Sequence, residues 1–157
     1  MTFIGFAAKR EDEANFKTAL EKHLKEIGRK AIVVAINEKS INNIKNIHFE
    51  TIIVDRNIKG LNQILKNTKY LILNADSVNT NQFHNMNLTV ITYGFSNKST
   101  ITASSIEEEK VLICLQRGIN SSKNTPIEPQ EISLNKIESE KNEYLYMIIG
   151  TIMLIYS

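Results

Sequence analysis

The chain is 157 residues long, a length typical of one domain, and its 42% hydrophobic and 23% charged residues exclude a disordered protein. The 19 Lys and Arg residues nearly cancel the 17 Asp and Glu residues, so the formal net charge of +2 argues against nucleic acid as a partner. The single cysteine, Cys114, excludes an internal disulfide and a metal cluster held by cysteines alone.

The first part of the chain, residues 1–95, alternates short apolar runs with amphipathic segments. The apolar runs predict strands at residues 3–8, 31–36, 51–54, 70–73 and 88–93. A long helix is predicted from about Asp12 to Gly28, because apolar side chains recur there every three or four residues. Shorter helical segments are predicted at residues 40–46 and 61–65. Since strands and helices alternate, we expect right-handed crossovers and a mostly parallel sheet.

Residues 96–135 have a different rhythm, in which strands follow one another without helices between them. Strands are predicted at residues 100–105, 111–116 and 131–134, with a hairpin loop at 107–109 and a longer loop at 120–129. A last helix, within residues 139–157, is predicted to begin near Ser139. The whole chain, residues 1–157, therefore predicts a single α/β domain of three layers, with helices on both faces of a mostly parallel sheet and an antiparallel extension.

The most apolar stretch runs from Tyr144 to Tyr156 and has 13 residues. A membrane-spanning helix needs about 20 such residues, so we expect a buried helix here and not a membrane anchor. At the start of the chain a short apolar run is followed at once by charged residues, which is not the pattern of a signal peptide. Together these features predict a cytoplasmic protein.

Three segments of the second half carry a family resemblance: Leu71–Asp76 (Leu-Ile-Leu-Asn-Ala-Asp), Val90–Phe95 (Val-Ile-Thr-Tyr-Gly-Phe) and Ile101–Ile106 (Ile-Thr-Ala-Ser-Ser-Ile). With the final helix, they resemble the later part of the central domain of the Mur ligases, which use ATP to join amino acids to peptidoglycan precursors or related polymers. Ile4-Gly5-Phe6 resembles the strand before the phosphate-binding loop of that family. The resemblance therefore implies a central domain that is shortened in the middle and stands without flanking domains.

The resemblance breaks at the phosphate-binding loop, which in the family reads Thr-Gly-Thr-Asn-Gly-Lys-Thr. Such a loop needs glycines whose backbone N–H groups approach the phosphates, a Lys for their charge and a Thr for Mg²⁺. The corresponding positions here are Ala7, Ala8, Lys9, Arg10, Glu11, Asp12 and Glu13. The three acids suit the positive end of the following helix but would repel a triphosphate. We therefore expect neither ATP nor Mg²⁺ as a cofactor, and no metal site.

Three polar residues at the ends of predicted strands are candidates for ligand contact: Asp55, Asn74 and Asp76. Ligands of parallel α/β sheets bind at the carboxyl ends of the strands, and Asn74 and Asp76 match the Asn-x-Asp motif of the resembled family. The alternative, which we favour, is that these side chains cap the turns in which they lie. No catalytic residue is predicted, because the span from Asp55 to Tyr70 is too short for the Mg²⁺-binding and modified-lysine region of the ligases.

The remaining reactive side chains are predicted to be structural. His48 and His84 lack a partner at metal-ligand spacing, and Cys114 lies in a predicted strand as a small buried hydrophobe. His23 is expected to pack and not to bind a ligand, and Lys9, Arg10 and Arg117 are expected to face solvent. Ser104 and Ser105 lack the base or the nucleophile-elbow glycine that a catalytic serine needs.

These observations favour a non-catalytic, Mur-ligase-like protein, a pseudo-ligase that binds a partner protein or a small molecule and has a link to bacterial cell-envelope metabolism. An alternative is an active ligase-like or nucleotide-binding enzyme in which Lys9 and Arg10 replace the lost loop. A third is a chance resemblance, which leaves a doubly wound fold of unknown ligand. In the first case the apolar terminal helix is the expected surface for self-association or for a protein partner.

Overall fold

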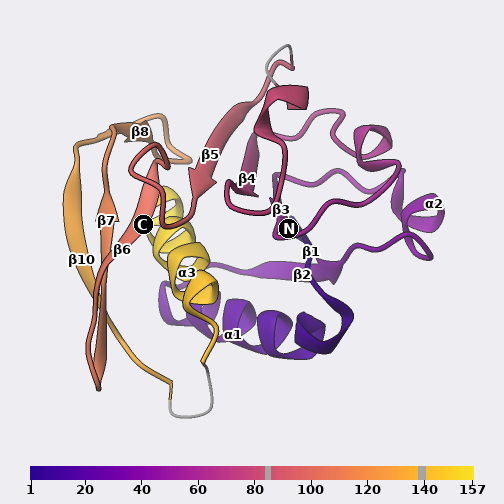
Figure 1. Ribbon diagram of the computed structural model, residues 1–157. Coiled ribbons are helices and arrows are strands. Elements are labelled where there is room, and N and C mark those ends of the chain that lie inside the picture. The colour runs from indigo at the N-terminus through magenta and orange to yellow at the C-terminus, as the bar shows by residue number, and fades with distance from the viewer. Residues whose placement is uncertain (84–85, 138–140) are drawn as a thin grey trace.

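The computed structural model describes residues 1–83, 86–137 and 141–157, and within them the strands form an eight-stranded sheet and a separate two-stranded ribbon. The sheet has the order β10-β7-β6-β5-β4-β3-β1-β2 (Figure 1). Its parallel part consists of β1 (Thr2–Ala7), β2 (Ala31–Ala35), β3 (Thr51–Val54), β4 (Tyr70–Asn74) and β5 (Thr89–Tyr93). The apolar runs predict all five strands, each to within one residue at either end.

The antiparallel extension consists of β6 (Ile101–Ile106), β7 (Lys110–Leu115) and β10 (Gln130–Asn135). It joins the parallel part through a single pair, Tyr93 on β5 with Ile101 on β6. The ribbon consists of β8 (Ile119–Asn120) and β9 (Pro126–Ile127). It forms where the sequence predicts only a loop, and Asn124, with a left-handed φ of +59°, makes the turn between the two strands.

Helices lie on both faces of the sheet. α1 (Glu13–Glu26) and α3 (Glu143–Tyr156) cover one face; α2 (Ile41–Ile44) and the 3₁₀ turns η2 (Leu61–Gln63) and η3 (Thr80–Phe83) cover the other. A further 3₁₀ turn, η1 (Arg10–Asp12), leads into α1. Because side chains alternate along a strand, Ile53 packs on the side of α1 and α3 whereas Ile52 packs beneath the short elements. The predicted fold class, α/β with a mostly parallel sheet and an antiparallel extension, is confirmed.

The short elements are less regular than predicted. The helix expected at residues 40–46 is a single turn, α2, and the segment 61–65 contains only the 3₁₀ turn η2. Positive backbone angles flank η2, at Gly60 before it and at Asn67 after it, and they bend the chain away from a regular helix. This second face is therefore covered mainly by turns, and the apolar side chains of these turns fill the core beneath them.

The terminal helix α3 lies inside the fold, and eleven of its 14 residues are buried. Figure 1 shows β6, β7 and β10 curling past one side of α3 while α1 lies beside it. Asn142 caps its start, since its side-chain oxygen accepts a hydrogen bond from the N–H of Tyr144 at 3.1 Å. The predicted start at Ser139 falls outside the described residues. The sheet and α1 cover the apolar side chains of α3, so self-association, which stays a prediction, needs another surface.

None of the helices in the described part of the chain combines the length and the apolar character that crossing a membrane requires.

Gly150 is expected to resist replacement by alanine, although alanine favours helices. A Cβ atom at Gly150 would lie 2.9 Å from Cγ2 of Ile113, a fully buried side chain of β7. Overpacking costs about 1–3 kcal/mol, which exceeds the roughly 0.5–1 kcal/mol that Gly→Ala contributes inside a helix. Gly150→Ala should therefore lower the free energy of unfolding, measured by urea denaturation, by about 1 kcal/mol.

The matched control is Gly118→Ala. A Cβ atom at Gly118 meets only the carbonyl oxygen of Ile127, at an ordinary 3.4 Å, so this change should leave the stability nearly unaltered. A Gly150→Ala variant that is more stable than the parent would contradict the tight packing of α3 on β7.

Candidate functional site

The carboxyl ends of the parallel strands gather the polar residues that the sequence singles out. Asp55 follows β3, while Asn74 ends β4 and Asp76 lies two residues beyond it. β2 and β3 lie on opposite sides of β1, so the winding of the sheet reverses between β1 and β3. In open α/β sheets, ligands bind in the crevice at this reversal, outside the carboxyl ends. This edge is therefore the candidate site.

Asp55 is the centre of a buried hydrogen-bonded cluster, with only 9% of its surface exposed. Its Oδ1 accepts hydrogen bonds from Nδ2 of Asn74 at 3.0 Å and from the hydroxyl of Tyr93 at 2.5 Å. Ser77 donates to its backbone oxygen at 2.7 Å. Burial, and after it the negative charge of Asp55, raises the pKa of Tyr93 well above its ordinary value, so the phenol stays protonated and donates.

Asp76 ties the same edge to the terminal helix. Its backbone N–H donates to Oδ1 of Asn74 at 2.9 Å, and its Oδ2 accepts from the N–H of Phe95 at 2.9 Å and from the hydroxyl of Tyr144 at 3.0 Å. Burial and the hydrogen bond to Asp76 raise the pKa of Tyr144 to about 12. Gly94 lies against this carboxylate, because a Cβ there would come within 2.7 Å of its Oδ1. The structure thus brings Asp55, Asn74 and Asp76 into one network with two tyrosines.

Arg56, which follows β3, reaches across the carboxyl end of β1, where open α/β sheets have their ligand crevice. Its Nε donates to the carbonyl oxygen of Ala8 at 2.9 Å, and its two terminal nitrogens donate to the two carboxylate oxygens of Glu38 at 2.9 and 3.0 Å. This bidentate pair is the strongest kind of arginine contact with a carboxylate. The hydrogen bonds from Arg56 lower the pKa of Glu38 to about 2, so the pair stays ionised at neutral pH.

The segment that resembles a phosphate-binding loop forms the end of β1, the turn η1 and the start of α1. Ala7 and Ala8 are fully buried, whereas Lys9, Arg10 and Glu11 are exposed. Asp12 precedes α1 without making a capping hydrogen bond, so its charge acts on the helix end only through space. Glu13 accepts a 3.4 Å hydrogen bond from Nδ2 of Asn37.

A hollow of about 530 Å³, the charged hollow, lies beside this crevice. Its lining comes from the connections after β1, β2 and β3, and every lining residue is polar or charged: Arg10, Glu13, Asn37, Glu38, Lys39, Ser40, Asn43 and Arg56. Its volume falls within the roughly 300–1,000 Å³ of small-molecule sites, although its lining lacks the apolar side chains that dominate most of them.

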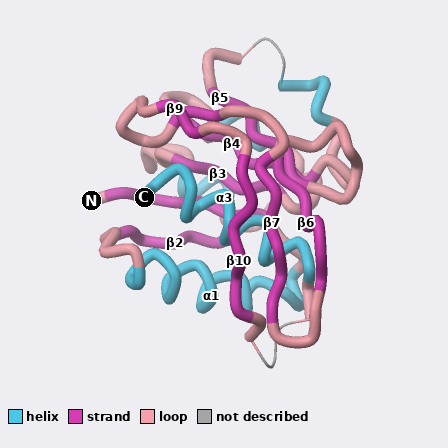
Figure 2. The backbone as a smooth tube through the Cα atoms, turned by 90° about the vertical axis from the view of Figure 1, so that its left-hand side faces the viewer, coloured by secondary structure: helices cyan, strands magenta, loops and turns pink. Residues whose placement is uncertain are grey.

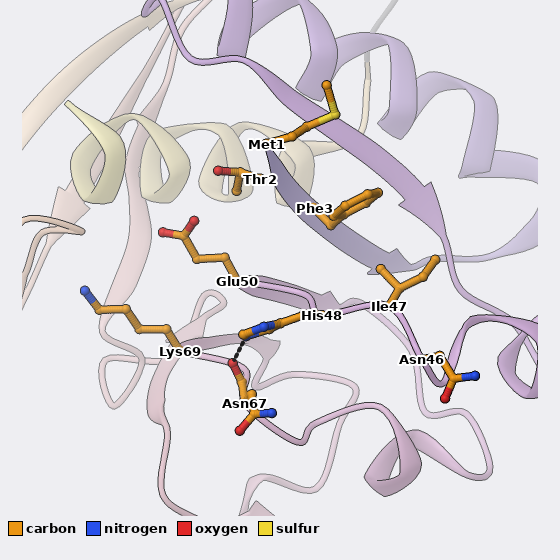
Figure 3. A pocket seen from close by; sticks show the side chains of 9 residues that line it. All are labelled: Met1, Thr2, Phe3, Asn46, Ile47, His48, Glu50, Asn67 and Lys69. Carbon is orange, nitrogen blue, oxygen red and sulfur yellow. Dashed lines mark hydrogen bonds between the residues drawn. The ribbon is translucent and has the colours of Figure 1, made fainter.

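A second hollow, of about 540 Å³, lies at the opposite edge of the sheet, before the amino ends of β1, β3 and β4 (Figure 3). Nine residues line it: Met1, Thr2, Phe3, Asn46, Ile47, His48, Glu50, Asn67 and Lys69. Nε2 of His48 donates to the carbonyl oxygen of Asn67 at 2.6 Å, and Nζ of Lys69 donates to that of Ser122 at 2.8 Å. The side chains of His48 and Lys69 are thus already hydrogen-bonded to backbone oxygens. Because ligands of open α/β sheets bind at the carboxyl ends of the strands, the charged hollow is the better candidate for a ligand site.

The other residues weighed in the sequence take local structural positions. His23 contacts the carbonyl oxygen of Ala19 at 2.8 Å, Ser104 donates to Glu131 at 2.9 Å, and Arg117 donates to the carbonyl oxygen of Lys98 at 2.6 Å. Cys114 is half-buried in β7, less enclosed than predicted, and Ser105 is half-buried in β6, while His84 lies outside the described residues. Across residues 1–83, 86–137 and 141–157, no three His, Cys, Asp or Glu side chains group as metal ligands would.

Sequence reasoning missed the roles of Arg56, Glu38 and Tyr144. Arg56 stands directly after a candidate residue at a strand end, which is a weak signal, but its partner is 18 positions away in a different connection. Tyr144 is 68 positions from Asp76 and sits in a stretch that reads as hydrophobic core. Neither pairing has a sequence pattern that could have identified it.

Comparison with protein-family models finds none that matches the chain, and comparison with curated proteins finds no match either. Within the described residues the chain forms a mixed, mostly parallel sheet of eight strands, and its relation to the Mur ligases stays a prediction.

Glu38 is expected to titrate far below an ordinary glutamate, with a pKa of about 2 measured by NMR of its side-chain carboxyl carbon. Because this pKa is lower in the folded chain than the ordinary 4.5, the pair stabilises the fold above about pH 4.5 and loses that effect as the pH falls towards 2. Arg56→Gln should return the pKa towards 4.5. Lys59→Gln, which removes only a weaker charge effect, should move it less; equal shifts would contradict the bidentate pair.

Tyr93→Phe is expected to destabilise the fold by about 1–3 kcal/mol, because it leaves a buried carboxylate short of one donor. Tyr144→Phe removes a similar hydroxyl, but its acceptor Asp76 is exposed and keeps the N–H of Phe95, so the loss should be below about 1 kcal/mol. Chemical denaturation of both variants measures the difference. Equal losses would show that Asp55 does not depend on Tyr93.

Proposed function

We propose that the protein is a non-catalytic relative of the Mur ligase central domain, one that acts by binding a small molecule or a partner protein and not by ATP-dependent ligation. The observation that carries this proposal is the position of Arg56 across the crevice between β1 and β3. In open α/β sheets that crevice receives the ligand, and in the resembled family the neighbouring loop receives the phosphates of ATP.

The charge of Arg56 is already neutralised, which argues against a role in holding phosphate. Both terminal nitrogens are engaged with Glu38, and Nε is engaged with the carbonyl oxygen of Ala8. An incoming phosphate would have to break the bidentate pair and would then face the carboxylates of Glu38 and Glu13 on the wall of the same hollow. Because negative charges that lie close together repel each other, the charged hollow disfavours a ligand with several negative charges.

The carboxylates at the strand ends are also engaged. Mg²⁺ binds oxygen ligands in a near-ideal octahedron and needs carboxylates that are free to turn towards it. Oδ1 of Asp55 accepts from Asn74 and Tyr93, and Oδ2 of Asp76 accepts from Phe95 and Tyr144. These hydrogen bonds fix the orientation of both groups and support a structural role for the cluster in place of magnesium binding.

The second candidate function is a nucleotide-binding or ligase-like enzyme with an altered loop. The observation in its favour is that Lys9 and Arg10 are exposed beside the crevice and that Arg10 lines the charged hollow. In that case these two side chains would replace the missing lysine of the loop and bind phosphate oxygens.

Titration calorimetry with ATP and Mg²⁺ separates the two functions. The proposal predicts no saturable heat up to about 1 mM nucleotide, an affinity limit of roughly −4 kcal/mol. Magnesium-dependent binding that is lost in Lys9→Ala or Arg10→Ala, and kept in the control Lys45→Ala, would overturn it in favour of the second function. Lys45 is a suitable control because it is exposed and is not among the residues lining the charged hollow.

A screen of small polar compounds, followed by ¹H–¹⁵N NMR, tests the binding part of the proposal. Saturable shifts are expected at the lining of the charged hollow, with Asn37 and Ser40 as reporters. Asn37 and Ser40 are hydrogen-bonded to each other, the N–H of each donating to the side-chain oxygen of the other. Because these bonds fix the local structure, a change in their amide signals reports a ligand nearby and not a rearrangement of the loop. Shifts confined to the opposite edge, around His48 and Lys69, would move the binding site away from the carboxyl ends.

A further inference from the structure

The eight-stranded sheet has two edge strands, β2 and β10. α1 packs against one face of β2, where Val33 is 2% exposed, while Ile32 of the same strand is 40% exposed. β10 lies at the outer limit of the molecule, next to β7, with no described element beyond it (Figures 1 and 2). β10 is an open edge of the sheet, and with six residues it is longer than the five-residue β2.

The backbone of β10 presents unpaired groups to solvent. The N–H of Lys136, directly after the strand, donates to the carbonyl oxygen of Glu109 at 2.8 Å, so even-numbered residues here face β7. In an antiparallel pair, neighbouring residues direct their N–H and C=O groups to opposite sides. Glu131, Ser133 and Asn135 consequently direct theirs outwards, and all three residues are exposed. Three N–H groups and three C=O groups thus lie along this edge, and no strand among the described residues pairs with them.

Within its six residues β10 lacks the features that usually protect an edge, which here stand only just outside it, Pro129 before the strand and Lys136 after it. Natural edges carry prolines, lysines, bulges or charges that turn inwards, because a bare edge pairs with other chains. The strand reads Gln-Glu-Ile-Ser-Leu-Asn, and its register with β7 is unbroken over all six residues. Its single charge, Glu131, accepts a 2.9 Å hydrogen bond from Ser104 on the outer face of the sheet. An uninterrupted, nearly uncharged edge is suited to pairing.

We propose that β10 is an interaction surface for a second copy of this chain, and that the two β10 strands pair antiparallel about a two-fold axis at Ser133. In this register the outward groups of Ser133 meet those of Ser133 of the second copy, and Glu131 faces Asn135 of the second copy. Each of the three facing pairs exchanges two N–H···O bonds, so all six backbone groups on each edge are used.

In this register, and not in those shifted by two residues, both apolar side chains of β10 face an apolar partner. Ile132 and Leu134, which lie on the core side of the strand, meet each other across the axis, so apolar faces apolar. A slip of two residues in one direction sets Leu134 opposite Gln130, and in the other direction sets Ile132 opposite Lys136. In the proposed register Gln130 faces Lys136 and no like charges face each other, which favours a second copy over a peptide of arbitrary sequence.

The pairing is expected to be weak and reversible. One six-residue strand pair buries less than the roughly 1,200–2,000 Å² of a stable interface, which places the dimer in the transient class. Sedimentation velocity and light scattering over a wide range of concentrations should therefore show a mass that rises from one chain towards two as the protein is concentrated.

Ser133→Pro is the first diagnostic variant. Proline removes the N–H at the axis, and because that N–H faces away from β7, an edge strand tolerates the change. The dimer should be lost while circular dichroism stays that of the parent. Ser133→Thr is the matched control, since it keeps the N–H and favours strands, and it should dimerise as the parent does.

Ser133→Lys tests the same contact without touching the backbone. It sets two positive charges directly opposite each other at the axis, should abolish the dimer at low salt, and leaves an exposed position that cannot disturb the core. A parent that stays monomeric at every concentration would overturn the proposal. So would a dimer that survives both Ser133→Pro and Ser133→Lys, or a monomer that instead adds an extended peptide along β10.

Discussion

The burial of α3 is the constraint on which the rest of the structure depends. Its apolar side chains point in nearly every direction, so a single flat face of a sheet cannot cover them. α1 and the parallel strands cover part of the helix, and β6, β7 and β10 curl past it to cover the remainder (Figure 1). The curl ends at a free edge, β10, and the start of the helix brings Tyr144 to the carboxyl ends of β4 and β5. Hydrophobic burial thus decides where the polar features lie.

The carboxyl edge has the position of a ligand site and the bonding of a structural one. Asp55 and Asp76 accept hydrogen bonds from amide, hydroxyl and backbone donors of the same chain. For the buried Asp55 these bonds compensate the cost of burying its charge, and in both residues they occupy oxygens that a ligand would otherwise contact. The network also connects β3, β4, β5 and α3, elements far apart in sequence. The charged hollow lies open to solvent at this edge, where Arg10 and Lys39 are exposed, and it is therefore the site to which the proposed function assigns ligand binding.

The layout of the sheet could be predicted from the sequence because its strands are short apolar runs of four to six residues, a length typical of strands, whereas the longer apolar run of α3 has the length of a helix. Parallel strands also place their carboxyl ends at one edge, so the meeting of Asp55, Asn74 and Asp76 followed from topology. The partners of these residues did not. Glu38 reaches Arg56, and Tyr144 reaches Asp76, through three-dimensional packing of distant connections, which no spacing in the sequence encodes. The 3₁₀ turn η2 was not predicted either, because the positive φ angles of Gly60 and Asn67 override the local helical pattern.

The Arg56–Glu38 pair matters for what the crevice admits more than for how stable the fold is. Its side chains are 28% and 49% exposed, and ion pairs at such surface positions contribute at most about 1 kcal/mol. The pair matters more for whether anions are attracted to the end of β1. An unpaired guanidinium above the end of β1 would attract anions into the place where the resembled ligases hold phosphate, whereas the bidentate pair cancels that attraction. The bonding of one arginine at the end of β1 is therefore the physical basis of the proposal that this sheet does not serve as a nucleotide site.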